Sequence, residues 1–149
     1  MDELAAPARA LADGVVAALS AWVERSVDRR YRAALGPPPP DVLDAARRAG
    51  AAARDDVGPR LRALLETDAD AQRTTPLTIV REAVVYPTRV LAAAGVPARR
   101  RDPLDQAMFP DDTYELTPAT FADLDPRLTD AAVAWGAAKA WLHRRRHQP

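Results

Sequence analysis

The chain has 149 residues, of which 48% are hydrophobic, 28% are charged and 5% are aromatic. This composition indicates one globular domain and excludes a disordered or membrane-embedded protein. The formal net charge is zero and there is no cysteine, which disfavours a protein that coats nucleic acid and excludes disulfides, thiolate nucleophiles and cysteine metal sites.

Alanine supplies much of the apolar share, and runs of β-branched and aromatic residues are scarce. Because alanine has the highest helix propensity, we expect an all-α, single-domain helical bundle of four main helices plus a short one. The N-terminus, MDELAAPARALADGVVAALSAW, has acidic residues first and no basic region before an apolar one. We find no apolar run of spanning length there, so we expect a cytoplasmic protein that does not contact a membrane.

The first predicted helix covers residues 1–36. Its apolar residues recur every three or four positions and define one face: Leu11, Val15, Leu19, Trp22 or Val23, and Val27. Gly36 and the run Pro37–Pro40 end this helix. We interpret the four prolines as a stiff polyproline II spacer, in preference to a ligand for an SH3-like groove, because no x-P-x-x-P register flanks them.

The second predicted helix covers residues 41–66, with Asp41 as its N-cap. Pro59 lies inside it and should kink the helix or divide it in two. The apolar face is rich in alanine and has limited area to bury within one chain, which makes self-association plausible. Its residues are Val42, Ala46, Ala49, Ala53, Val57, Leu61 and Leu64.

The third predicted helix covers residues 75–95. Thr75 followed by Pro76 is a typical helix start, and Gly95 followed by Val96 and Pro97 is a typical end. Two adjacent apolar stripes predict that this helix is central in the bundle, and Pro87 should bend it near Tyr86. The stripes are Leu77, Val80, Val84, Pro87, Leu91 and Ala94, and Ile79, Ala83, Tyr86 and Val90.

Residues 102–125 form an acidic, proline-containing strap, and the last helix with its basic tail covers residues 126–146. Thr117 should cap a short helix whose Phe121 and Leu124 face inward, and Asp125 with Pro126 should start the last helix. Trp141 lies beside the inward stripe of that helix, where we expect partial burial. The stripe consists of Leu128, Ala132, Trp135, Ala138 and Leu142.

The sequence offers few groups for catalysis. His143 and His147 are four residues apart, a spacing that suits zinc, but three arginines lie between them and repel a cation. With no other histidine and no cysteine, a nucleophile–base pair cannot be assembled, and no phosphate-loop or dinucleotide motif is present. Asp111 and Asp112 could contact a divalent cation, but adjacent residues need a third ligand. We therefore assign no catalytic, metal or cofactor residue and expect a protein that is not an enzyme.

The charges are polarised although they cancel overall. Residues 102–130 hold eight acidic residues against Arg127 alone, and basic residues flank them at Arg99, Arg100 and Arg101 and at Arg144, Arg145 and Arg146. Three explanations compete. The acidic segment packs on the protein's own basic ends, it docks on a basic partner, or the basic segments contact nucleic acid with a steep salt dependence.

Three stretches carry a resemblance to a known family: TTPLTIVREAVVYPTRVLAAAGVP, FPDDTYELTPATFADLDP and WGAAKAW. Between Thr74 and Trp141 the chain resembles a family of short, uncharacterised all-helical proteins from actinobacteria. The resemblance implies a cytoplasmic bacterial protein and assigns no activity, ligand or site residue.

The leading functional prediction is a non-enzymatic protein-interaction or regulatory module that binds another protein or itself. The expected contacts are Asp111, Asp112, Tyr114, Glu115 and Trp141. The alternative is a nucleic-acid-associated protein that binds phosphates through Arg99–Arg101 and Arg144–Arg146.

Overall fold

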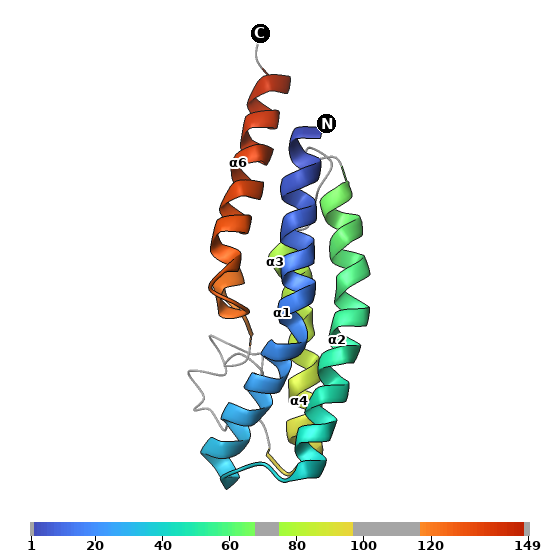
Figure 1. Cartoon of the computed structure of the whole chain (residues 1–149), viewed down its shortest axis with the longest axis vertical. Helices are drawn as coiled ribbons and strands as arrows, with labels where there is room; N and C mark the ends of the chain where they lie inside the picture. The colour runs from blue at the N-terminus through green and yellow to red at the C-terminus, as the bar shows by residue number, and fades with distance from the viewer. Residues whose placement is uncertain (1, 68–74, 97–116, 148–149) are drawn as a thin grey trace, which may run out of the picture.

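The computed structural model describes residues 2–67, 75–96 and 117–147, and these ranges contain helices and turns but no strand. The elements in chain order are α1 (Asp2–Leu35), α2 (Pro40–Glu66), α3 (Pro76–Arg81), the 3₁₀ helix η2 (Glu82–Val84), α4 (Val85–Ala93), the 3₁₀ helix η4 (Phe121–Asp123) and α6 (Leu128–Arg146). The predicted all-α bundle is confirmed (Figure 1). Most of the predicted acidic strap lies outside the described residues.

Helix α1 is the central element. It contacts α2, α4 and α6, and the predicted apolar face is buried along its length at Leu11, Val15, Leu19, Val23 and Val27. The prediction that the helix of residues 75–95 is central is therefore wrong. That segment is divided into three short pieces, and most of its second apolar stripe is only partly buried.

Alternate elements of the bundle run in opposite directions, so that α2 and α6 are each antiparallel to α1 (Figure 1). Helix α6 packs along the N-terminal part of α1, and Leu128, Trp135 and Leu142 belong to the same core cluster as Leu11 and Val15. A second, smaller cluster joins the C-terminal end of α1 to the start of α2 and the end of α4. Its buried residues are Val27, Val42, Ala46, Leu91 and Val96.

Helices α1 and α2 approach each other closely at Gly50. A Cβ atom at this position would lie 2.9 Å from the Ser20 carbonyl oxygen, closer than real Cβ contacts allow. The Ser20 hydroxyl donates a hydrogen bond to the Gly50 carbonyl oxygen at 3.1 Å. Alanine and glycine on this face of α2 thus let two long backbones pack together, which answers how an alanine-rich helix buries its face within one chain.

Pro59 and Pro87 have different effects on the continuity of their helices. Helix α2 continues through Pro59 as a single helix, so of the two outcomes predicted there, a kink or a division, the division is wrong. The helix of residues 75–95 is interrupted by η2, at Ala83 and its two neighbours, rather than at Tyr86. The reason is that Pro87 offers no N–H to the Ala83 carbonyl four residues earlier and crowds it, which favours tighter i→i+3 bonding at that turn.

Glycine ends two helices as predicted. Gly36 and Gly95 have φ angles of 89° and 85°, in the left-handed region. At Gly95 the Val96 N–H bonds to the Leu91 carbonyl at 2.8 Å and the Gly95 N–H to the Ala92 carbonyl at 3.2 Å. These two bonds define a Schellman motif, and Val96 and Leu91 supply its buried apolar contact.

Three predicted helix starts differ from the structure. The N-cap of α2 is Pro39 with Pro40 at the first helical position, so Asp41 lies in the first turn. The short helix η4 is capped by Thr120 rather than Thr117, because Asp123 completes a capping box with Thr120. Helix α6 begins after Arg127, and the Asp125 carboxylate accepts the Arg127 N–H at 2.9 Å just before it.

Helix α1 is long and apolar enough to cross a membrane by length and composition, contrary to our expectation for the N-terminus. The same apolar residues form the core of the bundle, with Leu11, Val15 and Leu19 fully buried. Packing within the chain therefore accounts for the hydropathy of this helix.

Candidate functional site

Of the residues predicted to make functional contacts, the structure describes those on α6. Trp141 lies near the end of this helix, and Arg144, Arg145 and Arg146 form its last turn. The remaining candidates lie outside the described residues. They are Asp111, Asp112, Tyr114, Glu115 and Arg99–Arg101.

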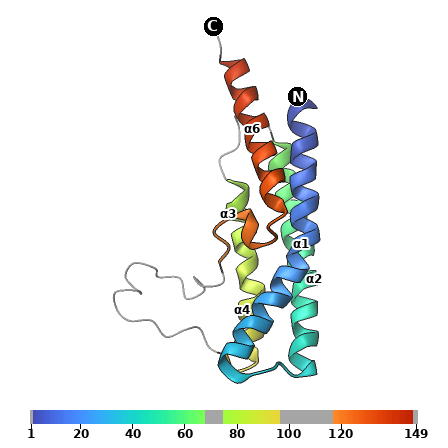
Figure 2. The same ribbon diagram turned by 60° about the vertical axis from the view of Figure 1, so that its left-hand side comes forward.

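Among the described residues, helix α6 packs mainly against α1 and η4. Its inner face carries Leu128, Trp135 and Leu142, which are buried against α1, as the predicted inward stripe requires. The Lys139 ammonium lies 5.0 Å from the centre of the Trp135 ring, a cation–π contact that covers the edge of this face. In Figures 1 and 2, α6 stands at the edge of the bundle, and its last turns extend beyond the first turn of α1.

The opposite side of α6, which we call the outer face, is also apolar. Val133 is 65% exposed and Trp141 is 39% exposed, and three exposed alanines lie between them on the same side of the helix. The outer face consists of Val133, Ala134, Ala137, Ala140 and Trp141. Of these five residues, only Trp141 was predicted from the sequence. The other four were not, because the apolar residues of α6 occur all around the helix and alanine is found on both buried and exposed faces.

The Trp141 indole contacts a cationic side chain of the next turn. The Arg145 guanidinium lies 5.2 Å from the centre of the ring, within cation–π range. The residue is still 39% exposed. Exposed aromatic side chains with an apolar body and a polar N–H are typical of protein contact surfaces.

The two ends of α6 carry opposite charge. Asp123, Asp125 and Asp130 lie at or just before its start, and Arg144–Arg146 lie in its last turn. This distribution complements the helix dipole at both ends. The hydrogen bonds from Arg127 hold the pKa of Asp125 down at about 2, so this carboxylate is ionised under all ordinary conditions. At the basic end the His143 and His147 rings lie 4.4 Å apart between centres and are tilted by 46°.

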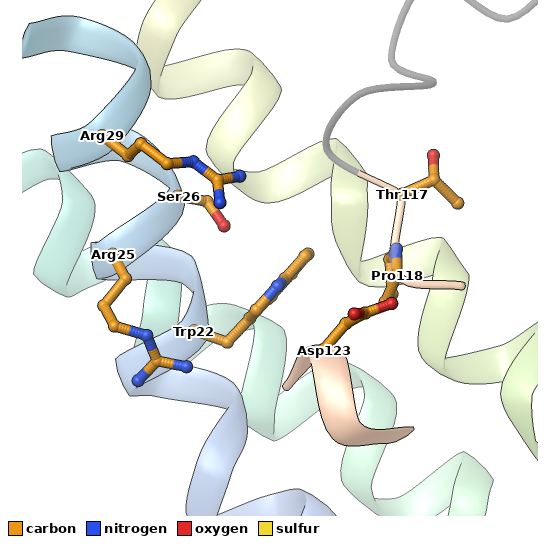
Figure 3. Close-up of a pocket in the computed structure, with 7 residues that line it drawn as sticks. All are labelled: Trp22, Arg25, Ser26, Arg29, Thr117, Pro118 and Asp123. Atoms are coloured by element: carbon orange, nitrogen blue, oxygen red, sulfur yellow. The ribbon is translucent and has the colours of Figure 1, made fainter. Parts of the chain in front are cut away.

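A small hollow of about 240 Å³ lies between α1 and the loop before η4 (Figure 3). Trp22, Arg25, Ser26 and Arg29 line it from α1, and Thr117, Pro118 and Asp123 line it from the loop side. The sequence did not indicate this group of residues, because its two halves lie about a hundred positions apart in the chain.

The polar groups around this hollow are used to hold the loop. Arg25 donates to the Leu124 carbonyl oxygen at 2.6 Å. On the other side of the loop, Arg81 donates to the carbonyl oxygens of Pro118 at 3.0 Å and Ala119 at 3.2 Å. The Asp123 carboxylate accepts the backbone N–H of Ala119 at 2.7 Å and of Thr120 at 2.9 Å. The hollow is smaller than most ligand pockets, which span about 300–1,000 Å³. We interpret it as an anchor for the loop.

Within residues 2–67, 75–96 and 117–147, no group of three or more histidine or acidic side chains is placed to hold a metal ion.

Comparison of the chain with protein-family models, with curated proteins and with solved structures found no match.

Proposed function

We propose that the protein is a non-enzymatic interaction module that binds another protein chain through the outer face of α6. The observation that carries this proposal is the exposure of Val133 and Trp141, at 65% and 39%, on the face of α6 opposite to the one that packs against α1. Single exposed apolar residues are ordinary, but a continuous apolar helix face flanked by charges is typical of a contact surface.

The shape of the outer face favours a helical or flat partner. Three alanines between Val133 and Trp141 leave a shallow strip into which larger side chains of a partner can insert. Trp141 at one end and Val133 at the other provide the apolar anchors, and the surrounding charges form the polar rim. The expected partner is therefore a protein surface with an apolar ridge and complementary charge at its ends.

Site-specific photocrosslinking tests this proposal. A benzophenone amino acid at Val133, introduced in cells of the native host, should give discrete adducts of higher mass. The same amino acid at Ala52, an exposed alanine of α2, is the matched control and should give none. Adducts that are absent at Val133, or equal at both positions, would refute the outer face as a contact surface.

The nucleic-acid alternative is separated by its salt dependence. Binding through Arg144–Arg146 requires an affinity for labelled duplex DNA or single-stranded RNA that falls steeply between about 50 and 200 mM salt. It also requires that replacement of these three arginines by serine abolishes binding. On the interaction-module proposal, the protein shows no such binding at the higher salt concentration.

A further inference from the structure

The outer face of α6 has a heptad repeat. Asp130, Ala137 and Arg144 are seven residues apart and lie on one line along the helix. Val133 and Ala140 form a second such pair, and Ala134 and Trp141 a third. An exposed seam with this period is the pattern by which one helix packs along another over several turns. Its apolar part is bounded by an acid at one end and a base at the other.

The outer face of α6 is complementary to the same face of a second copy that runs in the opposite direction. In an antiparallel pair of identical helices, residues at equal distances before and after the two-fold axis face each other. With the axis at Ala137, Val133 faces Trp141 of the second copy, since they lie four residues before and four after it. Asp130 and Arg144 lie seven before and seven after, so an acid faces a base at both ends. The small side chain of Ala137 at the axis lets the two helices approach closely.

Charge complementarity selects the antiparallel orientation. The first turn of α6 carries Asp130, and its last turn carries Arg144–Arg146, so reversal places the acidic residue beside a basic end. The two helix dipoles are then also opposed, which is favourable. A parallel pair would place acid beside acid and base beside base. Among the described residues, no ion pair or side-chain hydrogen bond joins Asp130 or Arg144 to another group.

We infer that the occupant of the outer face is a second copy of this chain, in a two-fold symmetric dimer with antiparallel α6 helices. This inference rests on the proposed function and names its partner. One helix from each copy buries less area than the 1,200–2,000 Å² of a stable complex. The dimer therefore exchanges with the monomer, with a dissociation constant on the order of micromolar to tens of micromolar.

Sedimentation velocity of the whole chain from about 1 to 200 μM tests the inference. The wild type, with a monomer mass of 16.2 kDa, should shift from monomer to dimer over this range. Asp130→Arg places two like charges together at each end of the interface and should weaken association about tenfold or more. Arg144→Asp should do the same. The double variant Asp130→Arg/Arg144→Asp restores both pairs and should recover the wild-type dissociation constant.

Variants at the axis test the position of the interface. Ala137→Glu brings two carboxylates together at the centre of the seam and should abolish the dimer, while its matched control Ala52→Glu on α2 should leave it unchanged. Circular dichroism should show the same helix content for both. A wild type that stays monomeric at the highest concentration, a double charge reversal that does not restore association, or a dimer that survives Ala137→Glu would each overturn the inference.

The failure of this inference is distinguishable from failure of the proposed function. If the wild type is monomeric but the photocrosslinker at Val133 forms an adduct with a different protein, the outer face is a contact surface and the second copy is the wrong occupant. If the protein is monomeric and Val133 forms no adduct, both are wrong.

Discussion

Replacement of Gly50 by alanine tests the close packing of α1 and α2. The new Cβ atom would lie 2.9 Å from the Ser20 carbonyl oxygen, 3.1 Å from its Cα and 3.3 Å from its carbonyl carbon. All three atoms belong to the backbone, so the contact can be relieved only if the helices move apart. Gly136 of α6 is the matched control, because a Cβ atom there meets nothing within 4 Å.

The substitutions Gly136→Ala and Gly50→Ala should change the free energy of unfolding in opposite directions. Alanine in place of glycine favours a helix by about 0.8–1.0 kcal/mol, which Gly136→Ala should show as a gain in stability. At Gly50 the same gain is opposed by overpacking, which costs about 1–3 kcal/mol. The hydrogen bond from Ser20 to the Gly50 carbonyl also weakens, with a further loss of about 1 kcal/mol. Gly50→Ala should therefore destabilise the protein by about 1–3 kcal/mol.

Urea denaturation followed by circular dichroism, at a few micromolar protein, measures both changes in the monomer. The midpoint should fall for Gly50→Ala and rise for Gly136→Ala, with an unchanged slope. In thermal melts the difference for Gly50→Ala corresponds to a decrease of about 2–12 °C. A Gly50→Ala variant that is as stabilised as Gly136→Ala would refute the close approach of the two helices at this point.

Three further predictions concern side-chain contacts at the surface. The pKa of Asp125 is lowered to about 2, so the stability that its carboxylate provides is present above pH 4 and is lost as the pH falls through 2. The difference in unfolding midpoint between wild type and Asp125→Asn should therefore narrow from pH 5 to pH 2, and a constant difference would contradict the role of the Arg127 contact. Partial burial and the hydrogen bond to Asp56 at 2.7 Å raise the pKa of Tyr86, so its contribution to stability is present below pH 10 and is lost as the pH rises through the folded-state value. Absorbance at 295 nm should show one tyrosine that titrates late in the wild type and is missing in Tyr86→Phe. Arg81→Gln removes two hydrogen bonds to the loop before η4, and it should destabilise the protein by about 1 kcal/mol and speed amide exchange in that loop.

Local chemistry in the sequence predicted much of the fold. The four-residue spacing of Leu11, Val15 and Leu19 identified the buried face of α1, and Gly95 with Val96 identified the end of α4. Both depend on interactions within a few residues. The position of α1 at the centre was not predicted, because it depends on which faces of distant helices meet.

The contacts that hold η4 and its flanking residues were missed for the same reason. Arg25 and Leu124 are 99 positions apart, and no pattern in the sequence marks them as partners. The cap of η4 was within reach, since Thr120 and Asp123 have the spacing of a capping box, but the Thr117–Pro118 pair resembled a helix start more strongly.

The outer face of α6 could not be predicted from the periodicity of apolar residues. The inward stripe at Leu128, Trp135 and Leu142 was predicted from its larger residues. The alanines on the opposite side carried no information about their surroundings, because alanine occurs both inside and outside. Only the fold shows which face of α6 packs against α1, and that Val133 on the opposite face is exposed.

Disulfide formation by an Ala137→Cys variant tests the central claim most directly. The natural chain has no cysteine, so the new thiol has only its counterpart in a second copy as a partner. At the two-fold axis the two Cα atoms should approach to the 4.4–6.8 Å that a disulfide requires. Mild oxidation at about 50 μM protein should therefore convert Ala137→Cys into a covalent dimer within minutes, while Ala52→Cys on α2 stays monomeric. Equal and slow conversion of the two variants would contradict an interface centred on Ala137.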